Sequence, residues 1–274
     1  VDYFHWPHQG DWKFDPEYWP DPAAMVRELK NMGIHLMVSV WPTVDRDSEN
    51  YEEMVELGFL TRSECGKRIG QLGDEACLID VTNPDGRAYV WEKIRKNYYE
   101  KGIRIFWLDE AEPEFTGYEF QNYRFFRGAD MEVGNIYPKE YARMVYEGME
   151  AQGQKQIVNL LRCAWAGSQR YGALVWSGDI DSSFRSLRNQ LAAGLNMGIA
   201  GMKFLSAGLN SGPSVRSCGC TGTGNRFRSR WGQPAEEKRT AERPTKYGVM
   251  ERRSMRSAGS ICCSGKSSAL MSGN

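Results

Sequence analysis

NPDGRAYVWEKIRKNYYEKGIRIFWLDEAEPE, residues 83–114, is the stretch that decides the fold class. Asn83 followed by Pro84 is a typical helix start, because an asparagine side chain caps the first turn and proline fits its first position. The helix that follows carries its apolar residues on one face, at Val90, Ile94 and Tyr98. Gly102 ends it, and residues 103–108 (IRIFWL) form a short apolar run typical of a strand buried on both faces. The stretch therefore predicts a helix that leads into an inner strand of a sheet.

The same alternation of helix and strand recurs along residues 1–202. Further apolar runs predict strands at residues 34–40, 157–161 and 173–176. Helices are predicted to begin at Asp21-Pro22, at Tyr137-Pro138 and at Ser182, the last with Phe184, Leu187, Leu191 and Leu195 along one face. This alternation indicates a parallel sheet with helical crossovers, either a β/α barrel or a doubly wound sheet. No glycine-rich phosphate loop follows a predicted strand, which argues against the nucleotide-binding folds.

Polar and aromatic residues stand where these strands end, at Trp41, Asp109, Arg162 and Asp179. The carboxyl ends of parallel strands meet at one face, and ligands bind there in both candidate folds. Asp109 opens a run of four acidic residues within residues 109–114, which is costly unless the charges are used or neutralised. Two simpler interpretations stay open at this point. The acids could only solvate a strand end, and Asp179 could only cap the next helix.

Taken together, the two aspartates and the nearby tryptophans suit a sugar. Apolar faces of sugar rings stack on indole, and the candidate rings are Trp6, Trp41, Trp107, Trp165 and Trp176. A retaining glycosidase needs an ionised carboxylate as nucleophile and a protonated carboxyl as acid, about 5–5.5 Å apart. Opposite environments would tune such a pair. Asp109 and Asp179 are the predicted pair.

At these residues the chain resembles glycoside hydrolase family 31, the α-glucosidases and α-xylosidases. The matching stretches, in family order, are DYFHW at 2–6, FDP at 14–16, WPDP at 19–22, VWP at 40–42, WLDEAE at 107–112, Arg162 with AGSQRY at 166–171, and WSGD at 176–179. Bacterial α-xylosidase-like members are the most similar in appearance. The resemblance covers nearly all of residues 1–202. It implies an incomplete (β/α)8 TIM barrel that runs from near the second strand to near the seventh.

The resemblance also implies a role for each matching residue. Asp109 would be the nucleophile and Asp179 the general acid/base. Asp2 and Arg162 would hydrogen-bond the sugar, while Trp41, Trp107 and Trp176 would line its site. Glu112 would support the nucleophile motif rather than react. The implied reaction removes terminal, non-reducing α-linked xylose or glucose with retention, and it uses no cofactor and no metal.

Charge divides the chain near Met202. The whole chain has 35 basic and 35 acidic residues, but from Lys203 onward there are 13 basic and 4 acidic residues. We therefore predict two parts, a partial catalytic barrel at 1–202 and a basic, irregular or disordered tail at 203–274. Codons for residues 215–226, read one base out of frame, permit P-V-M-R-M-H-G-D-R-E-P, a stretch that the family has. Shifted codons over 206–215 and 244–251 permit two further family stretches, so we interpret the tail as family sequence in the wrong frame.

The expected partner is an oligosaccharide or a small α-glycoside, with no nucleic acid and no membrane, and the parent enzyme could form a homo-oligomer. Seven scattered cysteines predict no disulfide framework and favour a reducing compartment such as the cytoplasm. The three histidines, His5, His8 and His35, form no metal-ligand set. Two alternatives stay open: a non-catalytic remnant that binds sugar or nothing, and an α-galactosidase-like barrel. Because the resemblance to the family stops after Met202, we also predict that this chain by itself is inactive.

Overall fold

The computed structural model describes residues 1–66, 70–71, 76–111, 122–178, 180, 183–202 and 205–206. All of these belong to one compact unit, within residues 1–228. The predicted boundary at 202/203 falls at the edge of this part, and nearly all of the predicted tail lies outside it.

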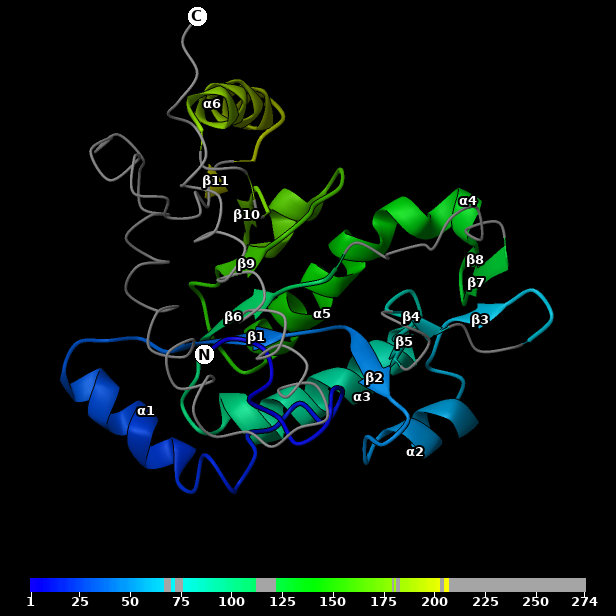
Figure 1. Cartoon of the computed structure of the whole chain (residues 1–274), viewed down its shortest axis with the longest axis vertical. Coiled ribbons are helices and arrows are strands. Elements are labelled where there is room, and N and C mark those ends of the chain that lie inside the picture. The colour runs from blue at the N-terminus through cyan, green and yellow to red at the C-terminus, as the bar shows by residue number, and fades with distance from the viewer. Residues whose placement is uncertain are drawn as a thin grey trace, which may run out of the picture. The chain divides into compact units, whose positions relative to one another are not determined.

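A parallel sheet is the centre of the fold (Figure 1). Its strands, in spatial order, are β1 (Met37–Val40), β6 (Ile105–Leu108), β9 (Asn159–Leu161), β10 (Ala173–Trp176) and β11 (Leu205–Ser206). Every pairing in this sheet is parallel. The four predicted strands are thus confirmed, with later starts for the first three. Helices lie between most of them, and a 3-10 turn lies between β9 and β10, as in a partial (β/α)8 barrel.

The sheet extends beyond the predicted strands at both of its edges. Val1 lies beside β1: its amino group donates to the carbonyl of Met37 over 2.7 Å, and the Ser39 amide donates to the Val1 carbonyl over 2.9 Å. Residues 2–6, which resemble a family strand end, form bends rather than a strand. At the other edge, Leu205 pairs with Val175, so a short parallel strand lies past the predicted boundary at residue 202.

Helices begin close to the predicted signals. Asp21 caps α1 (Pro22–Asn31) by accepting from the Ala24 amide over 2.8 Å. Asn83 caps α3 (Pro84–Ile94) by accepting from the Asp85 amide over 3.0 Å. The α3 helix continues as a π turn, η1 (Arg95–Tyr99). The other helices are α2 (Tyr51–Glu56), α4 (Asp130–Val133), α5 (Tyr137–Ala151) and α6 (Phe184–Ile199), with 3-10 turns η3 (Gly134–Ile136) and η4 (Ser168–Tyr171).

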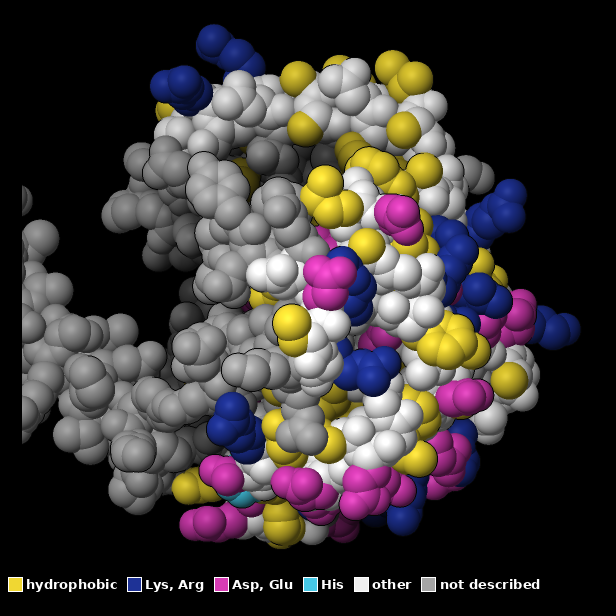
Figure 2. Space-filling model, turned by 90° about the vertical axis from the view of Figure 1, so that its right-hand side faces the viewer, with side chains coloured by type: hydrophobic (Ala, Val, Ile, Leu, Met, Phe, Trp, Pro, Cys, Tyr) yellow, Lys and Arg dark blue, Asp and Glu magenta, His cyan; other side chains and the backbone are white. Residues whose placement is uncertain are grey.

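The prediction for the last helix needs a correction. Ser183, not Ser182, caps α6, because the Ser183 hydroxyl accepts from the Ser186 amide over 3.2 Å. Its apolar residues do not face a core: Phe184, Leu191 and Leu195 are each more than 60% exposed. Figure 2 shows hydrophobic side chains at the top of the molecule, where α6 lies in Figure 1. The helical spacing of the apolar residues thus predicted the helix correctly, but it did not predict whether that face is buried.

Two small antiparallel sheets interrupt the alternation of strands and helices, and neither was predicted. One has the order β2 (Thr43–Asp45), β5 (Ala76–Leu78) and β4 (Gly70–Gln71). The other has the order β3 (Arg62–Ser63), β7 (Tyr123–Phe125) and β8 (Gly128–Ala129). Their strands have only two or three residues each, too few for an alternating pattern to stand out.

The core lies between the central sheet and the helices α3 and α5. Strand residues that alternate toward the helices are fully buried: Val38, Val40, Phe106 and Leu108. On the opposite face, Met37, Leu160 and Trp176 form a smaller buried cluster, with Ile105, Trp107 and Leu174 packed partly buried against it. The two faces of each strand therefore differ, and the second face carries the candidate site. Among the described helices, none is long and apolar enough to cross a membrane.

Candidate active site

The register of the central sheet places four of the predicted site residues in one row. Val40 pairs with Leu108, and Leu161 pairs with both Leu108 and Val175. The residues that follow these four along the chain are Trp41, Asp109, Arg162 and Trp176. Since side chains alternate along a strand, this row shares a face with Ile105 and Trp107 and lies opposite the helices. Between β6, which Asp109 follows, and β10, which precedes Asp179 in the chain, lies one strand, β9.

Asp109 is buried at the end of β6, with 6% of its surface exposed. Its Oδ2 accepts a hydrogen bond from Nε1 of Trp41 over 3.2 Å, and its amide donates to the Val40 carbonyl over 3.1 Å. The hydroxyl of Tyr141, from α5, donates to the same carbonyl over 3.1 Å. Burial raises the pKa of Tyr141 well above its ordinary value, and the charge of Asp109 raises it further, so Tyr141 stays a neutral donor.

Arg162, at the end of β9, brings a cation to the same place. Its Nη1 is in close contact with Oε1 of Glu110 and lies 4.0 Å from Oδ1 of Asp109. All three side chains are mostly buried, at 28%, 14% and 8% exposure for Arg162, Glu110 and Asp109. Two adjacent carboxylates therefore face one guanidinium, which offsets part of their repulsion.

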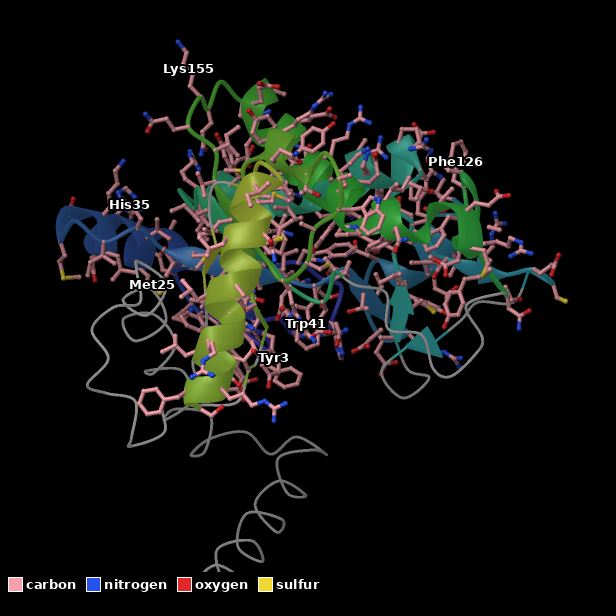
Figure 3. The ribbon with its side chains drawn as sticks, turned by 90° about the horizontal axis from the view of Figure 1, so that it is seen from above. Tyr3, Met25, His35, Trp41, Phe126 and Lys155 are labelled. Atoms are coloured by element: carbon pink, nitrogen blue, oxygen red, sulfur yellow. The ribbon has the colours of Figure 1, made fainter. Side chains whose placement is uncertain are left out.

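Aromatic rings surround this charged group. The ring of Tyr3 stacks on Trp41 with centroids 4.9 Å apart and an interplanar angle of 21°. The two residues are labelled close to each other in Figure 3. Trp6 meets Trp41 edge-on at 6.0 Å. On the other side, Trp107 and Trp176 pack edge-to-face at 5.3 Å. The row thus has a carboxylate and a guanidinium in its middle and tryptophans at both ends, an arrangement suited to a sugar ring.

The remaining predicted residues are placed as follows. Asp2 is half-buried, and its Oδ1 accepts from the Tyr3 amide over 2.8 Å, next to the ring that stacks on Trp41. Trp107 lies one row below Asp109 on the same face of β6. Glu112 and Asp179 lie outside the described residues, so the separation of the predicted catalytic pair stays a prediction. The described residues contain no group of three or more His, Cys, Asp or Glu side chains that could hold a metal ion.

Three residues near the row were not among the predicted site residues. Glu110 was not assigned a role from the sequence, and alternation along a strand would turn it away from Asp109. Tyr3 lies next to Asp2, but a sequence does not show which ring it stacks on. Tyr141 lies in the second turn of α5, and its hydrogen bond to the Val40 carbonyl depends on how that helix packs against the sheet. Only the clustering of acids after β6 signalled Glu110 in advance.

The comparisons with known proteins agree with this geometry. Residues 1–210 match the profile described as "Glycosyl hydrolases family 31 TIM-barrel domain". The chain belongs to glycoside hydrolase family 31. The protein named "Uncharacterized family 31 glucosidase ORF2" from Pseudescherichia vulneris is 55% identical over 203 residues, which are 74% of this chain and 38% of that protein. "Alpha-xylosidase A" from Aspergillus niger is 34% identical over 226 residues, covering 73% of this chain and 31% of that protein.

A solved structure gives the same family. The family 31 α-xylosidase from a soil metagenome, complexed with xylose, superimposes with a TM-score of 0.74 and 59% identity. The match covers 77% of this chain and 32% of that one. This family 31 chain therefore spans about a third of the length of the relatives that it matches.

Proposed function

We propose that this family 31 barrel belongs to a retaining α-glycosidase that removes terminal, non-reducing α-linked xylose or glucose. Asp109 would attack the anomeric carbon and form a covalent glycosyl-enzyme. Asp179 would protonate the leaving oxygen, and later it would deprotonate the water that releases the sugar. The observation that carries this proposal is the buried Asp109 in one row with Trp41 and Arg162.

The environment of Asp109 suits a nucleophile. An attacking carboxylate has to be ionised, and burial alone opposes ionisation. The N–H of Trp41 and the nearby cation of Arg162 both favour the charged form. Asp179 would need a drier or more negative setting that keeps its carboxyl protonated in the resting enzyme.

The sugar would lie across the row. Its hydroxyls would be bound by Arg162 and Asp2, and its apolar face would pack on the rings of Trp41, Trp107 and Trp176. Glu112 would support the loop after Asp109. We propose xylose first, because the soil-metagenome relative with 59% identity is described in complex with that sugar. Glucose is the alternative, because the Pseudescherichia vulneris relative is named a glucosidase.

A chimaera tests the proposal without depending on residues 203–274. Residues 1–202 would replace the matching segment of the soil-metagenome α-xylosidase, and release of 4-nitrophenol from its α-xyloside and α-glucoside would be followed. We expect turnover by the chimaera and negligible turnover by the 274-residue chain. The Asp109→Ala chimaera should lose turnover, and azide should restore it by giving the β-glycosyl azide. Asp47→Ala, which removes an exposed carboxylate, is the matched control.

Two results would contradict the proposal. One is near-normal turnover by the Asp109→Ala chimaera without azide. The other is an α-configured azide product. This product keeps the configuration of the substrate, so another residue would have to form a glycosyl-enzyme that azide then opens, and Asp109 would not be the nucleophile. For Asp179→Ala, we expect a larger loss with poor leaving groups than with activated ones, since the acid protonates the departing oxygen.

A further inference from the structure

Asp109 and Glu110, which are consecutive in the chain, share one guanidinium nitrogen. Nη1 of Arg162 touches Oε1 of Glu110 and lies 4.0 Å from Oδ1 of Asp109. Arg162 is therefore closer to Glu110, which has no role in the proposed reaction, than to Asp109. Both carboxylates are mostly buried, so their interactions with the guanidinium are stronger than those of a surface pair at the same distances.

A regular strand does not allow this sharing. Successive side chains of a strand point to opposite faces, so Glu110 should point away from Asp109. Glu110 instead has φ +51°, in the left-handed region that non-glycine residues rarely adopt. This conformation breaks the alternation directly after β6 and lets Glu110 reach Arg162. The chain thus keeps a strained backbone at the point where it brings a second carboxylate to the guanidinium.

We propose that Glu110 is a positioning residue that holds Arg162 at the 4.0 Å distance from Asp109 and keeps it out of a closer, two-pronged ion pair with that carboxylate. This inference rests on the proposed role of Asp109 as nucleophile. A two-pronged Arg–carboxylate pair would stabilise Asp109 in its resting state and occupy the oxygens that have to attack. Glu110 competes for the guanidinium, so Arg162 supplies positive charge nearby and keeps its orientation toward the sugar.

Three charged or titratable groups close to Asp109 come from three different elements. Glu110 follows β6, Arg162 follows β9, and Tyr141 comes from α5. Tyr141 is buried and neutral, so it does not take part in the competition. Removing Glu110 and removing Arg162 therefore have distinct expected effects on Asp109.

The test is a cycle of variants of the full 274-residue chain, read by carbon-13 NMR of the aspartate carboxyls. The four proteins are the unaltered chain, Glu110→Gln, Arg162→Gln and the double variant. Asp109→Asn assigns the Asp109 signal, and the midpoint of its titration is measured in each protein. In the chain with Arg162, we expect Glu110→Gln to lower the midpoint by about one pH unit or more, because the guanidinium moves onto Asp109.

The variants without Arg162 separate this movement from the loss of a neighbouring negative charge. In that background, Glu110→Gln should lower the midpoint much less, since no cation can move. Equal shifts in the two backgrounds would overturn the proposal, and so would an unchanged or raised midpoint in Glu110→Gln alone. Glu110→Ala provides a second variant for the same cycle if Glu110→Gln does not fold.

The NMR titration does not need turnover, so the positioning role of Glu110 can be refuted independently of the proposed function. An active Asp109→Ala chimaera would remove the nucleophile role while leaving the competition for Arg162 measurable. Equal shifts in the NMR cycle would remove the positioning role while leaving Asp109 as nucleophile. A merely structural role of Glu110 would change the stability of the chain but not the dependence of the midpoint on Arg162.

Discussion

Nε1 of Trp41 donates a hydrogen bond to Oδ2 of Asp109 over 3.2 Å and so joins the ends of the neighbouring strands β1 and β6. The Trp41 backbone is fixed from behind, because Nε1 of the buried Trp12 donates to its carbonyl over 3.0 Å. The Trp41 ring also contacts the rings of Tyr3 and Trp6. Trp41 therefore fixes the orientation of the Asp109 carboxylate, and in the proposed function it would also form a wall for the sugar.

Trp41→Phe removes this hydrogen bond and keeps an aromatic ring. Hydrogen bonds to charged groups contribute about 1.5–3 kcal/mol, so kcat/KM of the chimaera should fall by about 10- to 100-fold. Trp165→Phe is the control, because Trp165 is 47% exposed. A Trp41→Phe enzyme as active as the Trp165→Phe enzyme would show that the bond does not orient Asp109.

Glu140 in α5 is a buried carboxylate surrounded by cations. It is 1% exposed and lies within 4 Å of four basic side chains, Arg87, Arg127, Lys139 and Arg143. These come from α3, the β7–β8 turn and α5, so Glu140 ties an inserted sheet to the barrel helices. Glu140→Gln leaves Arg87 with little compensation and should lower the free energy of unfolding in urea by about 3 kcal/mol.

The control for this variant is Glu147→Gln. Glu147 pairs with Arg143 over 2.8 Å but is 47% exposed, and exposed pairs contribute about 0–1 kcal/mol. Similar losses in the two variants would mean that burial of Glu140 adds nothing to its ion pairs.

Two helical glycines make a matched test of packing. A Cβ on Gly148 in α5 would lie 2.2 Å from the ring of Trp91 in α3, whereas a Cβ on Gly198 in α6 would meet nothing within 4 Å. Gly148→Ala should lower the free energy of unfolding by about 1–3 kcal/mol. Gly198→Ala should raise it by up to about 1 kcal/mol, because alanine favours helix. Equal effects would contradict the close approach of α5 to α3.

Asp130 gives the stability of the chain a pH dependence. It is 8% exposed, its Oδ1 has no hydrogen-bond partner among the described residues, and burial raises its pKa to about 6. A pKa that is higher in the folded state stabilises the fold at low pH, and this contribution is lost as the pH rises from about 4 through 6. Asp130→Asn should therefore be more stable than the unaltered chain at pH 7.5, by about 2 kcal/mol, and nearly equal at pH 4.

Urea unfolding at both pH values measures this difference, with Asp47→Asn as the exposed control. A stability gain of Asp130→Asn that is the same at pH 4 and pH 7.5 would show that ionisation of Asp130 is not its cause.

The sequence predicted the elements whose pattern is local. The strands at residues 103–108 and 173–176 were recognisable because most of their residues on both faces are apolar. Helix starts at Asp21 and Asn83 were recognisable because capping and proline act within one turn. The site row followed from these strands, since their ends have to meet in a parallel sheet.

What the sequence did not predict depends on contacts between distant segments. The strands of the two inserted sheets are two or three residues long, and partners elsewhere in the chain fix their pairing. Glu110 joined the site through a left-handed backbone at a position where strand alternation pointed it outward. The exposed face of α6 shows the same limit, because an apolar stripe identifies a helix but not its partner.

The most direct test of the central claim is to trap the covalent intermediate on Asp109. A 5-fluoro-α-xylosyl fluoride carries a good leaving group, and its ring fluorine slows hydrolysis of the glycosyl-enzyme, so the nucleophile of the chimaera should stay labelled. Trypsin would release residues 105–124, which contain Asp109, Glu110, Glu112 and Glu114, and fragmentation would locate the sugar. We predict the label on Asp109, with none in the Asp109→Ala chimaera; a label on another residue, or no label in a chimaera that turns over α-xylosides, would contradict the account.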